Sequence, residues 1–439
     1  MFKTLVGAFK NKDIRKKIIY TLLILVVVRV GSLLPIPGVD TKYFSSLLSG
    51  INTGDLSYLS AVTGGSFERM SLFALSITPY ITSSIIMQLL TIAIPKLEEM
   101  QKEGEDGRKK IASITRYVTI GLSLIESIAM AVGFGRSGLI KDSAQLSTLH
   151  YVVCIIVVIA ALTAGSAVLM WLGERITEKG VGNGISIVLL INIISGMPSD
   201  FATLYSTFVA PKTPAKGVLA AVIILAILIV MVVLVCFLQD GERRIPVQYS
   251  QKVSGRRTVG GQSTNIPLKV NTAGVMPIIF ASSLMQFPVI IAQLFGKSYE
   301  WTRYLSSSYW CRVEAPKYSI GLLVYIVLLI IFAYFYTSIT FNPIEVADNL
   351  KKAGGVIPGI TPGKSTSEYL NKILNYIVFI GAVGLLIIAL IPIMCTGFFN
   401  ASVSFGGTSI IIIVGVVLET LKQIESQMCN RYYKGFLSE

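Results

Sequence analysis

The segment FERMSLFALSITPYITSSIIMQLLTIAIP, Phe67–Pro95, is apolar along most of its length and carries Pro79 near its centre. About 20 apolar helical residues cross the hydrocarbon core of a bilayer, so the segment predicts a membrane span. Ser and Thr hydroxyls surround the proline, and such hydroxyls can bond back to the preceding helical turn and relieve a kink. The segment alone predicts a kinked helix packed within protein, and it leaves open whether this helix lines a water-accessible path.

The composition of the whole chain extends this prediction. Of the 439 residues, 53% are hydrophobic and only 14% are charged. The apolar residues gather in blocks of about 20, which predicts an all-α polytopic membrane protein. The fifth block is the weakest, because Gly196 and Pro198 interrupt it. The ten predicted spans cover roughly residues 18–34, 71–94, 111–134, 149–172, 184–209, 215–238, 271–295, 318–340, 372–396 and 407–428.

Basic residues indicate how the spans are oriented. Most of the chain's 38 Lys and Arg residues fall before the first span, after the last, or in every second connection. Cytosolic connections are enriched in Lys and Arg, so these segments are predicted to be cytosolic, with both termini inside. An even number of spans places both termini on the same side of the membrane, in agreement with this prediction. The net charge of +14 also predicts attraction to anionic lipids.

Ten spans divide into two sets of five. The division falls near Pro211–Lys216, which gives an N-terminal half, 1–212, and a C-terminal half, 213–439. A duplicated half with an odd number of spans must be inverted in the membrane, as in channels and secondary transporters whose functional path runs between the halves. No clear sequence repeat accompanies the division, so this inference rests on the number of spans.

The sequence lacks the side-chain patterns of an enzyme or a metal centre. Its one histidine, His150, lies at the edge of a predicted span, so there is neither a His pair for zinc nor a Ser-His-Asp set. We expect no catalytic activity, no metal and no cofactor. Intramembrane acids and bases are also sparse, with Glu126 the main candidate deep in a span, and this argues against an ion-coupled transporter.

Two features near the opening segment favour a water-accessible path. Ile81 and Ile85 are four residues apart and therefore share one helix face. The upstream segment Ile51–Glu68 is rich in small residues and too polar to span. A short half-inserted helix would fit it, because irregular backbone at membrane depth survives only inside protein or beside a cavity.

Seven stretches carry a family resemblance: RVGSLLPIPGVD (29–40), SITPYITSSIIMQLL (76–90), EGEDGRKKIASITRY (103–117), MWLGERITEKGVGNGISI (170–187), GQSTNIPLKVNTAGVMPIIFASSLMQFP (261–288), TSITFNPIEVADNLKKAGGVIPGITPG (337–363) and FGGTSIIIIVGV (405–416). The resemblance that they carry follows this order and extends over essentially the whole chain. Together they resemble SecY, the family of channel subunits of the bacterial Sec protein translocase. Each stretch alone is weak evidence for the family, whereas seven stretches in the same order are very specific evidence.

The resemblance implies an hourglass pore between two inverted five-helix halves, closed by an apolar ring and by a short plug helix at about 56–67. An apolar constriction dewets, blocks ions and binds no passing peptide tightly. Matched motif by motif, the apolar ring comprises Ile81, Ile85, Ile185, Leu189, Ile279 and Ile412, and the plug includes Leu56, Tyr58, Leu59, Val62 and Phe67.

The resemblance also implies a lateral gate, in which the second and third spans face the seventh and eighth and open toward lipid. Glu126 in the third span could meet hydroxyls or Gln88 of the second span and Asn271 of the seventh. The alternative for Glu126 is a buried packing contact with a Ser or Thr.

Two cytosolic loops, 240–270 and 341–371, match the docking surface of this family for the ribosome and the ATPase SecA. Their basic residues could equally reflect topology and attraction to lipid. One position departs from the family pattern: Thr361 in ITPG stands where an arginine is usual. That arginine is associated with motor coupling, so an accessory SecY or a compensated motor contact would fit, and Thr361 is not assigned to a site. The candidate docking residues are Arg243, Arg244, Arg256, Arg257, Lys351 and Lys352.

The implied function is that of a passive channel in the bacterial plasma membrane. It would pass unfolded secretory polypeptides, recognise their signal sequences and release membrane spans laterally into lipid. The implied partners are the small subunits SecE and SecG, SecA and the ribosome. The alternative is an inverted-repeat secondary transporter of a small solute, which sparse intramembrane charge and large basic cytosolic loops disfavour.

Overall fold

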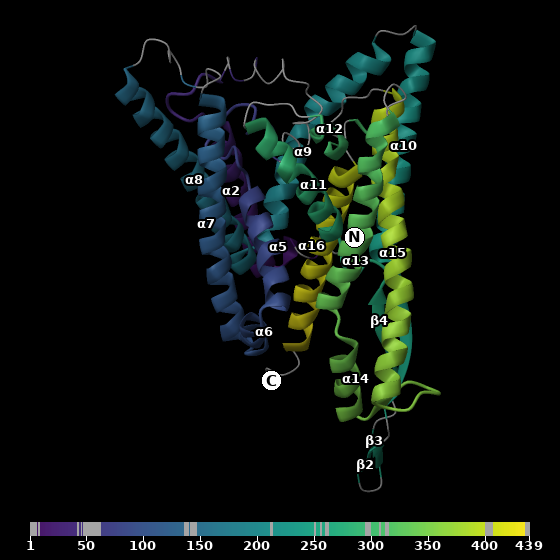
Figure 1. Cartoon of the computed structure of the whole chain (residues 1–439). Helices are drawn as coiled ribbons and strands as arrows, with labels where there is room; N and C mark the ends of the chain where they lie inside the picture. Colours follow the sequence, from purple (N-terminus) through teal and green to yellow (C-terminus); the bar gives the residue numbers. More distant parts are fainter. Residues whose placement is uncertain are drawn as a thin grey trace.

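The structure is a computed structural model, dominated by long helices with a small β unit at one end (Figure 1). It describes residues 7, 9–41, 44, 46, 63–135, 140, 147–210, 214–249, 252–254, 257–259, 263–294, 300–306, 309–311, 316–399 and 407–434.

Each of the ten predicted spans contains a helix, and this bears out the all-α architecture. These helices are α2 (Lys12–Leu33), α5 (Thr78–Ala93), α7 (Glu105–Gly135), α8 (Thr148–Lys179), α9 (Gly184–Leu204), α10 (Pro214–Asp240), α11 (Met276–Leu294), α13 (Ile320–Thr340), α15 (Lys364–Phe399) and α16 (Gly407–Lys434).

Length and composition qualify fewer of these helices as spans. Within the described residues, six helices are long and apolar enough to cross a membrane, or seven if α5 and the bent helix α6 (Pro95–Lys102) count as one span. α2 begins with a basic run and α16 ends with charged side chains, which lowers their apolar content. The count of ten spans therefore stays a prediction, whereas a multi-pass membrane protein is clear. Large apolar side chains on outward faces, such as Leu23, Ile156 and Val218, are more than half exposed, as lipid contact requires.

The expected kink at Pro79 is wrong. α5 begins at Thr78, so Pro79 lies in its first turn, and residues 64–77 before it form turns rather than helix. Proline fits a first turn because its missing N–H would have no partner there. The bend lies instead at Ile94, where α5 and α6 meet at 100°.

The hydroxyls of α5 behave as the sequence indicates. Ser83 Oγ donates to the Pro79 carbonyl at 2.7 Å, and Thr91 Oγ1 donates to the Met87 carbonyl at 2.7 Å. Such bonds to the preceding turn satisfy a hydroxyl inside an apolar environment. Most of the polar atoms of α5 are therefore used within the helix itself.

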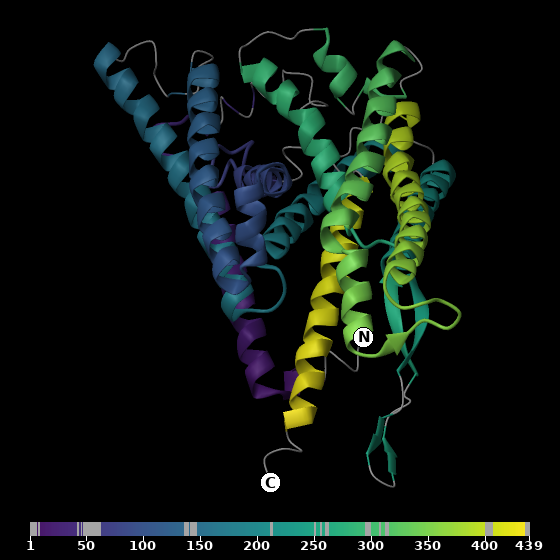
Figure 2. The same ribbon diagram turned by 60° about the horizontal axis from the view of Figure 1, so that its bottom comes forward.

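The long helices form two groups, which the colours of Figure 2 separate. α2, α5, α7 and α8 lie on one side, and α10, α11, α13, α15 and α16 lie on the other. α9 contacts α8 in the first group and α16 in the second, and α11 contacts α7 across the boundary. The domain division expected at 212/213 and the inverted-repeat relation stay predictions.

The two loops predicted at 240–270 and 341–371 form one folded unit, which we call the platform. β1 (Glu242–Tyr249) lies between β4 (Ser263–Lys269) and β5 (Gly355–Val356) in an antiparallel sheet, with α14 (Pro343–Lys352) beside them. Beyond the sheet, β2 (Lys252–Ser254) pairs with β3 (Arg257–Val259). The platform has its own apolar core, formed by Ile245, Val247, Leu268, Leu350, Ile357, Leu370, Ile373 and Ile377.

Residues 63–77, which we call the connecting segment, pack closely on helices of the first group. Leu72 N donates to the Leu34 carbonyl at 2.9 Å at the end of α2. On α8, a Cβ at Gly165 would overlap the Leu72 carbonyl. Only glycine allows this close approach of helix and segment.

Gly165→Ala is therefore expected to destabilise the protein, because overpacking costs about 1–3 kcal/mol. Gly121→Ala in α7 is the matched control, since a Cβ there would meet nothing within 4 Å. It should gain up to about 1 kcal/mol of helix propensity. Thermal unfolding of the purified protein in detergent measures both, and equal midpoints for the two variants would contradict the close contact at Gly165.

Candidate functional site

The structure brings the six residues of the apolar ring into one hydrophobic cluster. Leu189, Ile279 and Ile412 are buried, with exposed fractions of 4%, 7% and 2%. Ile81, Ile85 and Ile185 are partly buried and pack against them. The six side chains come from α5, α9, α11 and α16, and therefore from both helix groups. An apolar cluster at this boundary excludes water and ions without binding a ligand.

The start of α9 fixes the place of Ile185. Asn183 caps the helix, and its side-chain oxygen accepts from Ile185 N at 3.2 Å. Gly184 lies against the Gly173 carbonyl of α8, where a Cβ would not fit. The cap and the glycine contact together hold the first turn of α9 against α8.

The predicted plug residues Leu56, Tyr58, Leu59 and Val62 lie outside the described residues. Phe67 is described and is 3% exposed. Its ring packs edge-on against Phe44 and Phe134, at centroid distances of 5.9 and 6.4 Å. This aromatic cluster is separate from the cluster that holds the apolar ring, and the plug role of Phe67 stays a prediction.

Glu126 and Gln88 lie on α7 and α5, which contact each other, whereas Asn271 lies in the turn between β4 and α11, beside Gly381 of α15. α7, which carries Glu126, contacts both α5 and α11. Gln88 Nε2 donates to Ser84 Oγ at 3.4 Å, and Asn271 Nδ2 donates to the Gly274 carbonyl at 3.0 Å. Among the described residues, no hydrogen bond joins Glu126 to Gln88 or Asn271. The expected polar link is therefore missing from this structure, and the gate role stays a prediction.

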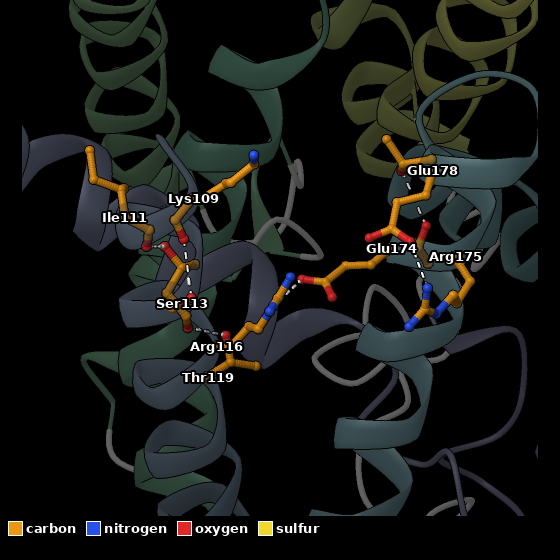
Figure 3. Close-up of polar contacts among 11 residues, drawn as sticks. Lys109, Ile111, Ser113, Arg116, Thr119, Glu174, Arg175 and Glu178 are labelled. Carbon is orange, nitrogen blue, oxygen red and sulfur yellow. Dashed lines mark hydrogen bonds and ion pairs between the residues drawn. The ribbon is translucent and has the colours of Figure 1, made fainter. Parts of the chain in front are cut away.

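An ion pair that the sequence did not predict ties α7 to α8. Arg116 Nε donates to Glu174 Oε1 at 2.7 Å, and Arg175 pairs with Glu178 on the next turn (Figure 3). Glu174 lies within the motif GERITEK, but spacing in the sequence gives no hint of a partner 58 residues away. Both side chains of the Arg116–Glu174 pair are partly exposed, so the pair orients the helix ends more than it stabilises the fold.

The docking candidates gather on the platform. Arg243 and Arg244 are exposed on β1, and Arg244 pairs with Glu242 at 2.6 Å. Lys351 and Lys352 are exposed at the end of α14. Because β5 follows α14 directly and pairs with β1, the two predicted loops present their basic residues on one unit. Arg256 lies outside the described residues, and Arg257 begins β3.

Thr361 has a local structural role. Its hydroxyl donates to Ser365 Oγ at 2.9 Å, and its carbonyl accepts from Thr366 Oγ1 at 2.9 Å. Both contacts lie at the start of α15, where backbone groups need side-chain partners. Threonine here therefore supports the helix start, and it is exposed.

The comparisons with known proteins agree with this geometry. A model of the SecY family matches residues 71–421. A protein of Streptomyces galbus named protein translocase subunit SecY is 44% identical over 452 aligned residues, which cover 100% of each chain. The chain belongs to the SecY family.

Two solved structures share the SecY fold at lower identity. One is a SecY structure in which the plug domain is said to stabilise the closed state of the translocation channel and to maintain a membrane seal. It has a TM-score of 0.61 at 18% identity and covers 94% of this chain and 92% of that chain. The other is Sec61 in a canine ribosome–channel complex, with a TM-score of 0.56 at 17% identity and the same coverage. Membership in the SecY family favours the channel over the small-solute transporter.

The SecY interpretation of Glu126 can be tested by Glu126→Leu. Burying a leucine is worth about 1.5–3 kcal/mol, so a more apolar seam between α7 and its neighbours should open less readily. Precursors with weakly hydrophobic signal sequences are expected to translocate several-fold less, while strongly hydrophobic signals stay efficient. Ile125→Leu, at a side chain 62% exposed, is the control. Unchanged signal selectivity in the Glu126 variant would rule out the gate role.

Proposed function

We propose that this chain is the pore-forming subunit of a bacterial protein translocase, which passes unfolded polypeptides across the plasma membrane and releases membrane spans into lipid. The observation that carries the proposal is the single cluster of Ile81, Ile85, Ile185, Leu189, Ile279 and Ile412, drawn from four helices of both groups. Flexible aliphatic side chains can close around a moving chain and seal again after it leaves.

The lateral route to lipid would open along the α7–α11 boundary. These helices touch but belong to different groups, so they can separate without breaking either group. Glu126 of α7 and Gln88 of the neighbouring α5 supply polar atoms that could meet a signal sequence, with Asn271 in the turn before α11 as the third proposed gate residue. The plug, at about 56–67, would cover the apolar ring from the outer side. In a structural relative, the plug domain stabilises the closed state of the channel and maintains a membrane seal, which supports this proposal.

The platform would face the cytosol and, together with both termini, mark the cytosolic side. Its exposed basic residues support docking of the ribosome and of SecA, whose ATP hydrolysis would supply the energy that this channel does not generate. A structural relative is a channel bound to a ribosome, which supports the first of these partners. SecE and SecG are the proposed small subunits, and the basic surface would also contact anionic lipids.

A stalled secretory precursor that carries a photo-crosslinker at successive positions tests the channel directly. Contacts with Ile81, Ile185, Ile279 and Ile412 are expected in turn as the crosslinker advances. Val222 of α10, whose side chain is 60% exposed on the outward face, is the control and should not react. A precursor that never reaches these isoleucines, with uptake of a small solute into vesicles instead, would favour the transporter.

Charge reversal tests the platform. Arg243→Glu combined with Lys351→Glu is expected to weaken binding of ribosomes and of SecA about tenfold at low salt, and less at high salt, because exposed charges are screened. Lys317→Glu is the matched control, because Lys317 lies just before the start of α13, at the opposite end of that helix from α14. Binding measured by flotation of reconstituted vesicles should fall only in the platform variant, and equal binding by all forms would remove the platform from docking.

A further inference from the structure

A buried polar contact lies beside the apolar ring and is not explained by the ring itself. Asn192 Nδ2 of α9 donates to Ser76 Oγ of the connecting segment at 3.0 Å. The two residues are 3% and 1% exposed. Asn192 follows Leu189 by three residues, which places it about one helical turn farther along α9.

A second contact ties the same turn of α9 to the start of the connecting segment. Ser195 Oγ donates to the Asn192 carbonyl at 2.7 Å and approaches the Gly64 carbonyl at 3.4 Å. Gly64 has φ +63°, and a Cβ there would crowd both Asn192 and Ser195. The contacts of one turn of α9 therefore hold the segment at Gly64 and at Ser76, near both of its ends.

The position of these contacts links three parts of the closed channel. The connecting segment runs from the proposed plug to α5, and α5 carries Ile81 and Ile85. α9 carries Ile185 and Leu189. Widening the ring by moving α9 away from α5 would therefore stretch the Asn192–Ser76 hydrogen bond.

Among the described residues, two further polar atoms near this bond are buried without a hydrogen-bond partner. They are Asn192 Oδ1 and Thr78 Oγ1, in the residue that makes the bond and in the first residue of α5. A buried polar atom without a partner disfavours the state that buries it. A state in which water or a peptide N–H reaches these atoms would gain a hydrogen bond that the closed state lacks. The residues that hold the closed state therefore also limit its stability.

We propose that Asn192 is a positioning residue for gating, whose bond to Ser76 holds the connecting segment against α9 while the apolar ring is closed and breaks when the ring opens. This inference rests on the proposed channel function. A purely structural role would make Asn192 important for folding, but not for the balance between the closed and open channel.

The test uses purified translocase that contains this chain, reconstituted into vesicles. Asn192→Ala, Ser76→Ala and the double variant are compared with the wild type for ion leak and for translocation of a precursor with a weakened signal sequence. Loss of one hydrogen bond should raise both readouts about fivefold. The double variant should match the single variants, because each of them removes the same bond.

A variant in which the two residues are exchanged controls for loss of folding, and we call it the exchange variant. Asn192→Ser with Ser76→Asn rebuilds the pair with the amide on the connecting segment and should return leak toward the wild-type value. Ser76 has φ +52°, a conformation that asparagine tolerates better than most residues. Thr203→Ala is the control, because Thr203 lies on α9, is half-buried and donates its hydroxyl to the Ser199 carbonyl within its own helix.

The outcomes separate the inference from the proposed function. Wild-type translocation with unchanged leak and unchanged signal selectivity in the Asn192 and Ser76 variants would overturn the gating role alone. Additive effects in the double variant, or no recovery in the exchange variant when its thermal unfolding is normal, would also overturn it. A wild-type chain that passes no precursor would instead overturn the channel function.

Discussion

The constraint on which the rest of this structure depends is that a pore for polypeptides must close without binding what it passes. Apolar contact meets this requirement, because it excludes water and ions but offers no directional bond to a peptide. The six residues proposed as the ring would do so with side chains from α5, α9, α11 and α16, which form one apolar cluster. Closure therefore requires both helix groups to stay in register, and every contact between the groups bears on the seal.

Polar groups at membrane depth follow a second rule, which is that each needs a partner within the protein. The connecting segment is irregular and could not face lipid. Its backbone bonds to the end of α2, and its side chains bond to α9. Within the part of the chain that the structure describes, the buried side-chain atoms left without a hydrogen-bond partner lie at Thr78, Gln88, Asn192 and Arg29. Gln88 is a gate candidate, and Thr78 and Asn192 belong to the contact between the connecting segment and α9.

The platform is one folded unit, although it consists of two loops far apart in the sequence. Two residues of β5 join β1, and apolar side chains from both loops and from α15 form one core. Basic residues at the surface can then act as a fixed pattern of charge rather than as separate flexible tails. The Arg116–Glu174 pair, by contrast, joins two of the long apolar helices, α7 and α8.

The sequence by itself determined the membrane class and the helical segments, because hydropathy is a local property of the chain. The order of its motifs gave the SecY resemblance, which proposes the six ring residues that the structure gathers in one cluster. The sequence placed Pro79 in a kink, because the irregular segment before Pro79 is apolar enough to resemble a helix. In the structure, Pro79 lies in the first turn of α5. Only the tertiary structure decided which distant groups meet: Arg116 with Glu174, Asn192 with Ser76, and β5 with β1. Such pairs depend on how helices and strands pack against each other, and no spacing along the chain encodes them.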